Sequence, residues 1–183
     1  MLPVLLRCVR NQLAPIPMQE AARPQRGAQA QPGGPSTERR AEALTLVANL
    51  LSEAGVKGFK LDASDDTVDV SWSAPGIRGG LAILTDGRIE QPTDTTPHLV
   101  AAAARKCKGK FISGAMPEED GGARAFSSCQ VGTAAPTVSQ YLTLRRPAGG
   151  YYIFVTHAVA AGNDNAEPGA EKQIRAAAYR VVK

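Results

Sequence analysis

Short runs of alternating apolar and polar residues, separated by turn residues, are the feature that most limits the fold of this chain. In residues 67–73, Val68, Val70 and Trp72 alternate with polar residues such as Asp69, as in a strand with one buried face. The predicted strands form two groups, at residues 57–62, 67–73, 80–85 and 88–91, and at 110–115, 123–129, 138–146 and 150–160. Short connections between consecutive strands favour antiparallel neighbours.

Three amphipathic helices are predicted before, between and after the two groups of strands. They run from a cap at Ser36 or Thr37 to Gly55, from Thr96 to Gly109, and over residues 170–182. The sequence therefore predicts an α+β fold in the order α-β4-α-β4-α, with an antiparallel β-sheet of about 6–8 strands covered by three helices. Because strands and helices do not alternate one by one, a doubly wound nucleotide-binding fold is not expected.

The first 37 residues differ in composition from the rest. They contain six prolines and few large apolar residues, so residues 1–37 are predicted to be a disordered or leader-like segment and residues 38–183 a single α+β domain. Ala28-Gln29-Ala30 has the small-residue pattern of a signal-peptide cleavage site, but the ten residues before it are polar. Either the match is accidental, or the natural start of the chain differs from the one given.

The charge of the chain does not predict a nucleic-acid partner. The net charge is +4, and four arginines and one glutamate place +3 of it in residues 1–37. The remaining 17 basic and 16 acidic residues give residues 38–183 a net charge of +1, with no extended basic stripe. No apolar run is long enough for a transmembrane segment. With two histidines and three cysteines, no metal or cofactor is expected.

Cys107 and Cys129 are the most informative pair of reactive side chains. Cys107 ends the apolar face of the second helix, and Cys129 ends a predicted strand. They are either reduced, buried residues or a structural disulfide, which would close about 22 residues and stabilise the fold by about 3 kcal/mol. Such a bridge would require an oxidising compartment. Cys8 lies in the segment that a leader peptidase would remove.

A catalytic site is not evident. His157 lies on a predicted strand, and the strand hydroxyls that could pair with it are Ser113, Ser127, Ser128 and Thr156. None of these serines lies in a nucleophile-elbow motif, and no phosphate loop or dinucleotide fingerprint is present. We therefore select no catalytic residue and keep a small hydrolase using His157 as an alternative.

Three tyrosines on the last predicted hairpin are candidate partner-binding residues: Tyr141, Tyr151 and Tyr152. Neighbouring residues on a strand point to opposite faces, so one face of the hairpin is needed for the core and the other could present tyrosine to a partner. The alternative is that a helix covers the second face.

Three segments together resemble a pattern found in secreted proteins of alphaproteobacteria whose function is not settled. They are residues 107–114 (CKGKFISG), 125–129 (AFSSC) and 149–154 (GGYYIF), and the resemblance spans about residues 38–183. It implies an exported protein whose Cys107 and Cys129 pair, and it assigns no catalytic residue. The order of elements is also similar to the Mog1/PsbP-like α/β/α sandwich, which serves mainly in binding and assembly.

Three functional hypotheses follow. The first is a non-catalytic domain exported to the periplasm or secreted, which binds a protein partner or an envelope component. The second is the small hydrolase with His157, and the third is a cytoplasmic adaptor with reduced cysteines. The identity of the ligand or partner and the oligomeric state are left open by the sequence.

Overall fold

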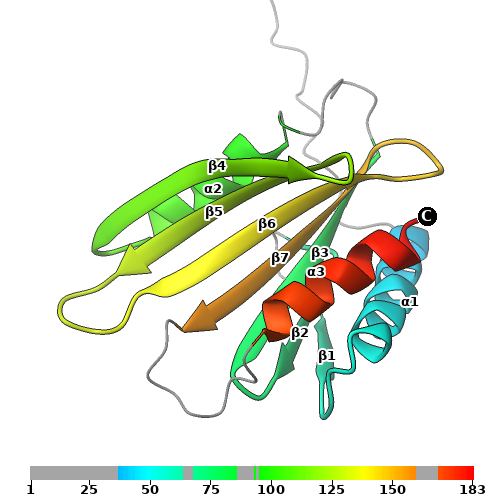
Figure 1. Cartoon of the computed structure of the whole chain (residues 1–183), viewed down its shortest axis with the longest axis horizontal. Helices are drawn as coiled ribbons and strands as arrows, with labels where there is room; N and C mark the ends of the chain where they lie inside the picture. Colours follow the sequence, from blue (N-terminus) through cyan, green and yellow to red (C-terminus); the bar gives the residue numbers. More distant parts are fainter. Residues whose placement is uncertain (1–36, 64–67, 86–92, 94, 160–168) are drawn as a thin grey trace, which may run out of the picture. The chain divides into compact units, whose positions relative to one another are not determined.

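The structure, a computed structural model, describes residues 37–63, 68–85, 93, 95–159 and 169–183. Three helices and seven strands lie in these residues (Figure 1). In chain order they are α1 (Thr37–Glu53), β1 (Lys60–Ala63), β2 (Val70–Ala74), β3 (Ile77–Leu84), α2 (Thr96–Lys106), β4 (Lys110–Glu119), β5 (Gly122–Gln130), β6 (Thr137–Arg145), β7 (Tyr151–Val159) and α3 (Ala170–Val181). All described residues belong to one compact unit.

The seven strands form one antiparallel sheet in the order β1-β2-β3-β7-β6-β5-β4. This confirms the predicted α+β fold with one antiparallel sheet. The predicted order α-β4-α-β4-α is not confirmed: three strands of the first group are described, and the fourth, at residues 88–91, lies outside the described residues.

One predicted strand boundary is wrong for a local reason. β3 begins at Ile77 and not at residue 80, because Pro75 and Gly76 form a tight turn and Ile77 pairs directly with Ala74. Gly76 has a φ of +74°, which a residue without a Cβ adopts at little cost. The N-terminal segment with Cys8 and the Ala28–Ala30 motif also lies outside the described residues.

Helices cover both faces of the sheet. α1 and α3 pack against one face, which we call the helix-pair face, and α2 lies behind β4 and β5 on the opposite face, which we call the α2 face (Figure 1). The larger core lies under the helix pair and includes Leu50, Ile174, Leu81 and Phe154. The smaller core, with Tyr141 and other apolar residues, lies on the α2 face. One helix covers the α2 face, whereas two cover the helix-pair face, so the α2 face has more room for a ligand.

The three candidate tyrosines are part of the packed fold. Tyr141, Tyr151 and Tyr152 are 4%, 3% and 7% exposed. No exposed ring therefore supports the prediction that these tyrosines contact a partner. Tyr152 lies in the core under the helix pair, as the helix-covering alternative requires. The guanidinium of Arg145 stacks on the ring of Tyr151 at 5.7 Å from its centre.

An ionic network joins α1 to the β6–β7 hairpin. The Nε and Nη2 atoms of Arg146 donate to the carboxylate of Glu42 at 2.7 and 2.6 Å, and the hydroxyl of Tyr152 donates to it at 2.5 Å. The hydrogen bond from Arg146 lowers the pKa of Glu42. Burial, together with the bond to Glu42, raises the pKa of Tyr152 to about 12. At neutral pH the carboxylate is therefore charged and the phenol neutral, which suits both as hydrogen-bonding partners.

Among the described residues, no helix is long and apolar enough to cross a membrane.

Candidate functional site

A row of polar side chains crosses the α2 face at one level of the sheet. Directly paired residues of neighbouring strands point to the same face, so the pairing register alone defines the row. From β1 to β4 the row contains Lys60, Ser73, Arg78, His157, Ser139, Ser127 and Ser113. We call it the polar row. It contrasts with the next levels of the same face, where apolar residues such as Val155, Tyr141 and Ala125 dominate.

The middle of the polar row is internally hydrogen-bonded. Ser139 Oγ lies 2.7 Å from Nδ1 of His157, and Ser127 Oγ lies 3.0 Å from the hydroxyl of Tyr141. Ser127 and Ser139 are buried, whereas His157 is half-buried. The β5–β6 part of the row is thus satisfied inside the fold. Its β2–β3–β7 part, with Ser73, Arg78 and His157, remains accessible.

Helix α2 is fixed to the sheet at both ends. At its start, Oγ1 of Thr95 lies 3.0 Å from Oγ1 of Thr143 on β6. At its end, Cys107 forms a disulfide with Cys129 on β5, with the two Cα atoms 5.8 Å apart. The helix therefore runs along the strands. Its last residues lie near the polar row, because Cys107 is bonded to Cys129, which is two residues along β5 from Ser127.

A groove of about 570 Å³ lies between α2 and the β2–β3–β7 part of the sheet. We call it the α2 groove. Leu99, Ala102 and Lys106 line it from the helix, where their spacing of three and four residues places them on one side. The sheet side is lined by Asp62, Ser71, Ser73, Arg78, Gly80, Val155 and His157, with Val68 and Tyr141 also in contact.

Gly80 keeps the floor of the groove flat. Gly79 pairs with Trp72 and so faces the helix-pair side, where a Cβ would lie 2.3 Å from the carbonyl oxygen of Val155 and 2.6 Å from the indole. A Cβ on Gly80 would lie 3.0 Å from a methyl group of Val68. Side chains cannot be added at these positions without displacing their neighbours, so the floor is backbone and the walls are side chains.

The groove has a positively charged end. Arg78 and Lys106 line it together with one carboxylate, Asp62, and all three side chains are exposed. Within the part of the chain that the structure describes, neither Arg78 nor Lys106 forms an ion pair. Both lie toward the polar row, whereas Val68, Leu99 and Val155 provide an apolar surface along the rest of the groove.

The hydroxyl group that contacts His157 in the structure is not one of the four predicted from the sequence. Ser113 and Ser127 lie in the polar row but on other strands, and Ser128 and Thr156 point to the opposite face. The hydroxyl that contacts His157 is Ser139. Arg78, Lys106 and Ser139 were not selected from the sequence, because the register of β3, β6 and β7 and the packing of α2 on the sheet bring them together.

The contact between Ser139 and His157 lacks the geometry of a catalytic triad. A triad needs a carboxylate that orients the imidazole. Asp62 is the carboxylate that lines the groove, and it lies on β1, three strands from β7, or about 14 Å away at the usual strand spacing. Among the described residues no group of three histidine, cysteine, aspartate or glutamate side chains could hold a metal ion.

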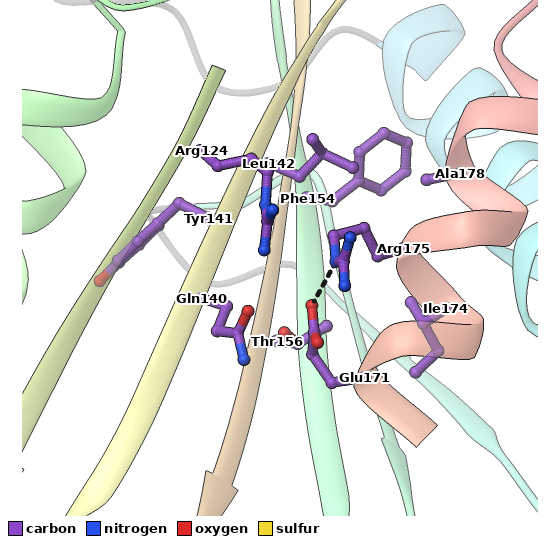
Figure 2. A pocket seen from close by; sticks show the side chains of 10 residues that line it. All are labelled: Arg124, Gln140, Tyr141, Leu142, Phe154, Thr156, Glu171, Ile174, Arg175 and Ala178. Atoms are coloured by element: carbon purple, nitrogen blue, oxygen red, sulfur yellow. Dashed lines mark hydrogen bonds and ion pairs between the residues drawn. The ribbon is translucent and has the colours of Figure 1, made fainter. Parts of the chain in front are cut away.

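A second polar cluster, on the helix-pair face, holds α3 against the sheet (Figure 2). Arg124 Nη1 lies 2.9 Å from Oε2 of Glu119, Arg175 pairs with the same carboxylate, and Arg175 Nε lies 3.1 Å from Oε1 of Glu171. The cavity beside Arg124, Glu171 and Arg175 is about 20 Å³, enough for one water molecule and too small for a ligand. We therefore assign this cluster a structural role.

No protein-family model and no curated protein matches this chain. The function is therefore argued from the α2 groove itself.

Proposed function

We propose that this protein is a non-catalytic binding domain that holds an amphipathic anion, with an apolar body and one carboxylate or phosphate group, in the α2 groove. One observation supports this most: the groove has two cationic side chains and a polar row at one end and an apolar surface along the rest. Its volume of about 570 Å³ lies within the usual range for small-molecule sites. Envelope lipids and their breakdown products have this chemistry.

The polar end suits an anionic group that stays partly hydrated. Arg78 offers a planar set of donors, and Lys106 adds a mobile ammonium group from the end of α2. His157 and Ser73 supply further hydrogen-bonding groups from the same level of the sheet. A ligand carboxylate here would form charge-assisted hydrogen bonds, which are stronger than neutral ones.

The remaining surface suits an apolar body. Leu99, Val68 and Val155 come from three different elements, and Gly80 leaves the floor between them without a side chain. Each buried methylene group of a ligand contributes about 0.8 kcal/mol, so an alkyl chain of moderate length gains affinity from this surface. The charged end then fixes the direction in which the ligand lies.

Titration with dodecanoate tests this proposal. We expect saturable binding by calorimetry and a change in the fluorescence of Trp72, the single tryptophan, which lines the groove. Arg78→Ala should weaken binding about fivefold, because an exposed cation contributes on the order of 1 kcal/mol to such a contact. Ala102→Phe should weaken it further, because the ring would obstruct part of the groove.

The matched control is Arg145→Ala, which removes an exposed strand arginine that does not line the groove. It should leave the affinity unchanged, and dodecyltrimethylammonium, of the same chain length but opposite charge, should not compete. Equal affinities for Arg78→Ala and the parent protein would exclude the proposed polarity of the site.

A hydrolase remains the second candidate function, because Ser139 Oγ and His157 Nδ1 are in hydrogen-bonding contact. Ser139→Ala decides between the two. If the protein hydrolyses activated esters and this variant abolishes hydrolysis while keeping dodecanoate affinity, the site is catalytic. If the parent protein shows no hydrolysis above that of free imidazole, the groove is a binding site.

Export to an oxidising compartment is the second part of the proposal, and the Cys107–Cys129 bridge supports it. In protein from its native host, we expect both thiols to resist alkylation until a reductant is added, as measured by intact mass. Immediate alkylation of both cysteines would instead support the cytoplasmic adaptor.

A further inference from the structure

Helix α2 buries little surface of its own. Thr96, in its first turn, is its buried residue, whereas Leu99 and Val100 are half-buried. Helix α3 has a similar length and buries five residues: Ala170, Ile174, Ala177, Ala178 and Tyr179. Because the burial of apolar side chains provides most of the free energy that holds a helix in a fold, α2 is held more weakly along its length than α3.

Open space lies on both sides of α2. The α2 groove, of about 570 Å³, lies on one side, where Leu99 and Lys106 line it. On the other side, a cavity of about 420 Å³ is lined by Pro97 and Val100 of the helix and by Ala115 of β4. Among the described residues, packing at the flanks therefore offers α2 little resistance to sideways movement.

Two contacts fix the ends of this helix. The contact of Thr95 with Thr143 lies before its first residue, and the Cys107–Cys129 bond follows its last residue. Lys106, which lines the charged end of the groove, directly precedes Cys107 in the chain. Cleavage of the bond would therefore release the end of the helix that carries Lys106, whereas the start of the helix would stay attached.

The Cys107–Cys129 bond lies within reach of a reductant. Both cysteines are half-buried. Lys106 and Lys108 flank Cys107 in the chain and are exposed, so the bond lies in positively charged surroundings. Thiolates are the species that attack disulfides, and positive charge attracts the incoming thiolate and stabilises the one that leaves.

We infer that the Cys107–Cys129 bridge is a redox switch that controls the affinity of the α2 groove. A thiolate of a dithiol reductant attacks one Sγ atom, the bond between the two Sγ atoms breaks through a mixed disulfide, and the reductant closes its own disulfide. Two electrons and two protons pass to the cysteines, which become thiols. The end of α2 then loosens, and the groove loses Lys106 and part of its wall. This inference rests on the proposed function, because it concerns the same groove.

Hydrogen–deuterium exchange of the full-length chain carrying Cys8→Ser tests the switch without a ligand. We expect reduction to accelerate exchange over residues 102–106 about tenfold or more, because the bridge no longer opposes local opening of the helix. Exchange over residues 174–179 of α3 should stay unchanged. The matched control is the further double variant Cys107→Ser/Cys129→Ser, which should exchange like the reduced protein and ignore the reductant.

Calorimetry with dodecanoate on the same samples tests the effect on the groove. We expect reduction to raise the dissociation constant about fivefold or more, because one exposed cation contributes on the order of 1 kcal/mol and part of the wall is lost as well. By linkage, saturating dodecanoate should shift the equilibrium of the bridge with a dithiothreitol redox buffer toward the oxidised form by the same factor. Alkylation followed by intact mass measures this shift.

The outcomes separate the switch from the proposed function. Equal affinities of the oxidised and reduced proteins for dodecanoate would overturn the switch and leave the binding site in place. If neither form binds, the proposed function fails. In that case faster exchange over residues 102–106 still supports control of the helix by the bridge, and unchanged exchange overturns it. Circular dichroism checks the fold, and a reduced protein that unfolds as a whole would also overturn the switch.

Discussion

Replacing both Cys107 and Cys129 by serine should lower the free energy of unfolding by about 3 kcal/mol. The bridge closes a loop of 22 residues, and cross-linking such a loop removes about that much conformational freedom from the unfolded chain. Among the described residues, the other contacts of α2 with the sheet include Leu99 and Val100 at the smaller core and Thr95 with Thr143. Loss of the bridge should therefore loosen α2 before the rest of the domain unfolds.

Urea unfolding of the parent protein, with and without reductant, and of the double variant measures this effect. All samples should contain Cys8→Ser, so that only one pairing of cysteines is available. We also expect faster amide exchange over Thr96–Lys106 in the double variant than in the parent protein. Identical unfolding midpoints for the oxidised and reduced proteins would show that the bridge does not stabilise the fold.

Asp69→Ala should destabilise the domain by about 3 kcal/mol. The carboxylate is 5% exposed, accepts a hydrogen bond from the backbone of Ile83 at 2.6 Å, and pairs with Nε of Arg39 at 2.7 Å. Its removal leaves a buried backbone donor and a partly buried guanidinium without an acceptor, and each such loss typically costs 1–3 kcal/mol or more. One side chain thus joins α1 to the β2–β3 hairpin.

Asp69→Asn offers a graded comparison, because it keeps one oxygen for Ile83 but loses the charge opposite Arg39. Its cost should fall between those of the parent protein and Asp69→Ala. Asp62→Ala, an exposed aspartate on β1, is the matched control and should change stability little. Thermal unfolding by calorimetry measures all three, and equal losses for Asp62→Ala and Asp69→Ala would contradict this assignment.

Most elements of the fold could be predicted from local patterns, because the residues that define a helix, a strand or a turn lie close together in the sequence. The amphipathic pattern that predicted α1 and the alternation that predicted the second group of strands both correspond to observed elements. The same local logic failed for Asp69, which the alternation placed on the polar side of a strand and which is nevertheless buried against α1. Its partners, Arg39 and Ile83, are distant in the sequence, so no local pattern could predict its burial.

The candidate site could not be predicted in the same way. His157 was visible as a strand histidine, but its neighbours Ser139 and Arg78 are 18 and 79 positions away along the chain. They meet because β3 and β7, from the two separate groups of strands, pair side by side. Strand order and register are long-range properties, and a shift of one residue would turn the whole polar row to the other face.

Amide chemical-shift mapping of the ¹⁵N-labelled protein during titration with dodecanoate tests the central claim most directly. If the α2 groove is the binding site, the largest shifts should occur at Ser71, Gly79, Gly80 and His157 and along Leu99–Lys106. Arg78→Ala should reduce these shifts at equal ligand concentration. Shifts confined to other surfaces, such as the apolar cavity between α2 and β4 around Val100 and Met116, or no saturable shifts at all, would contradict the account.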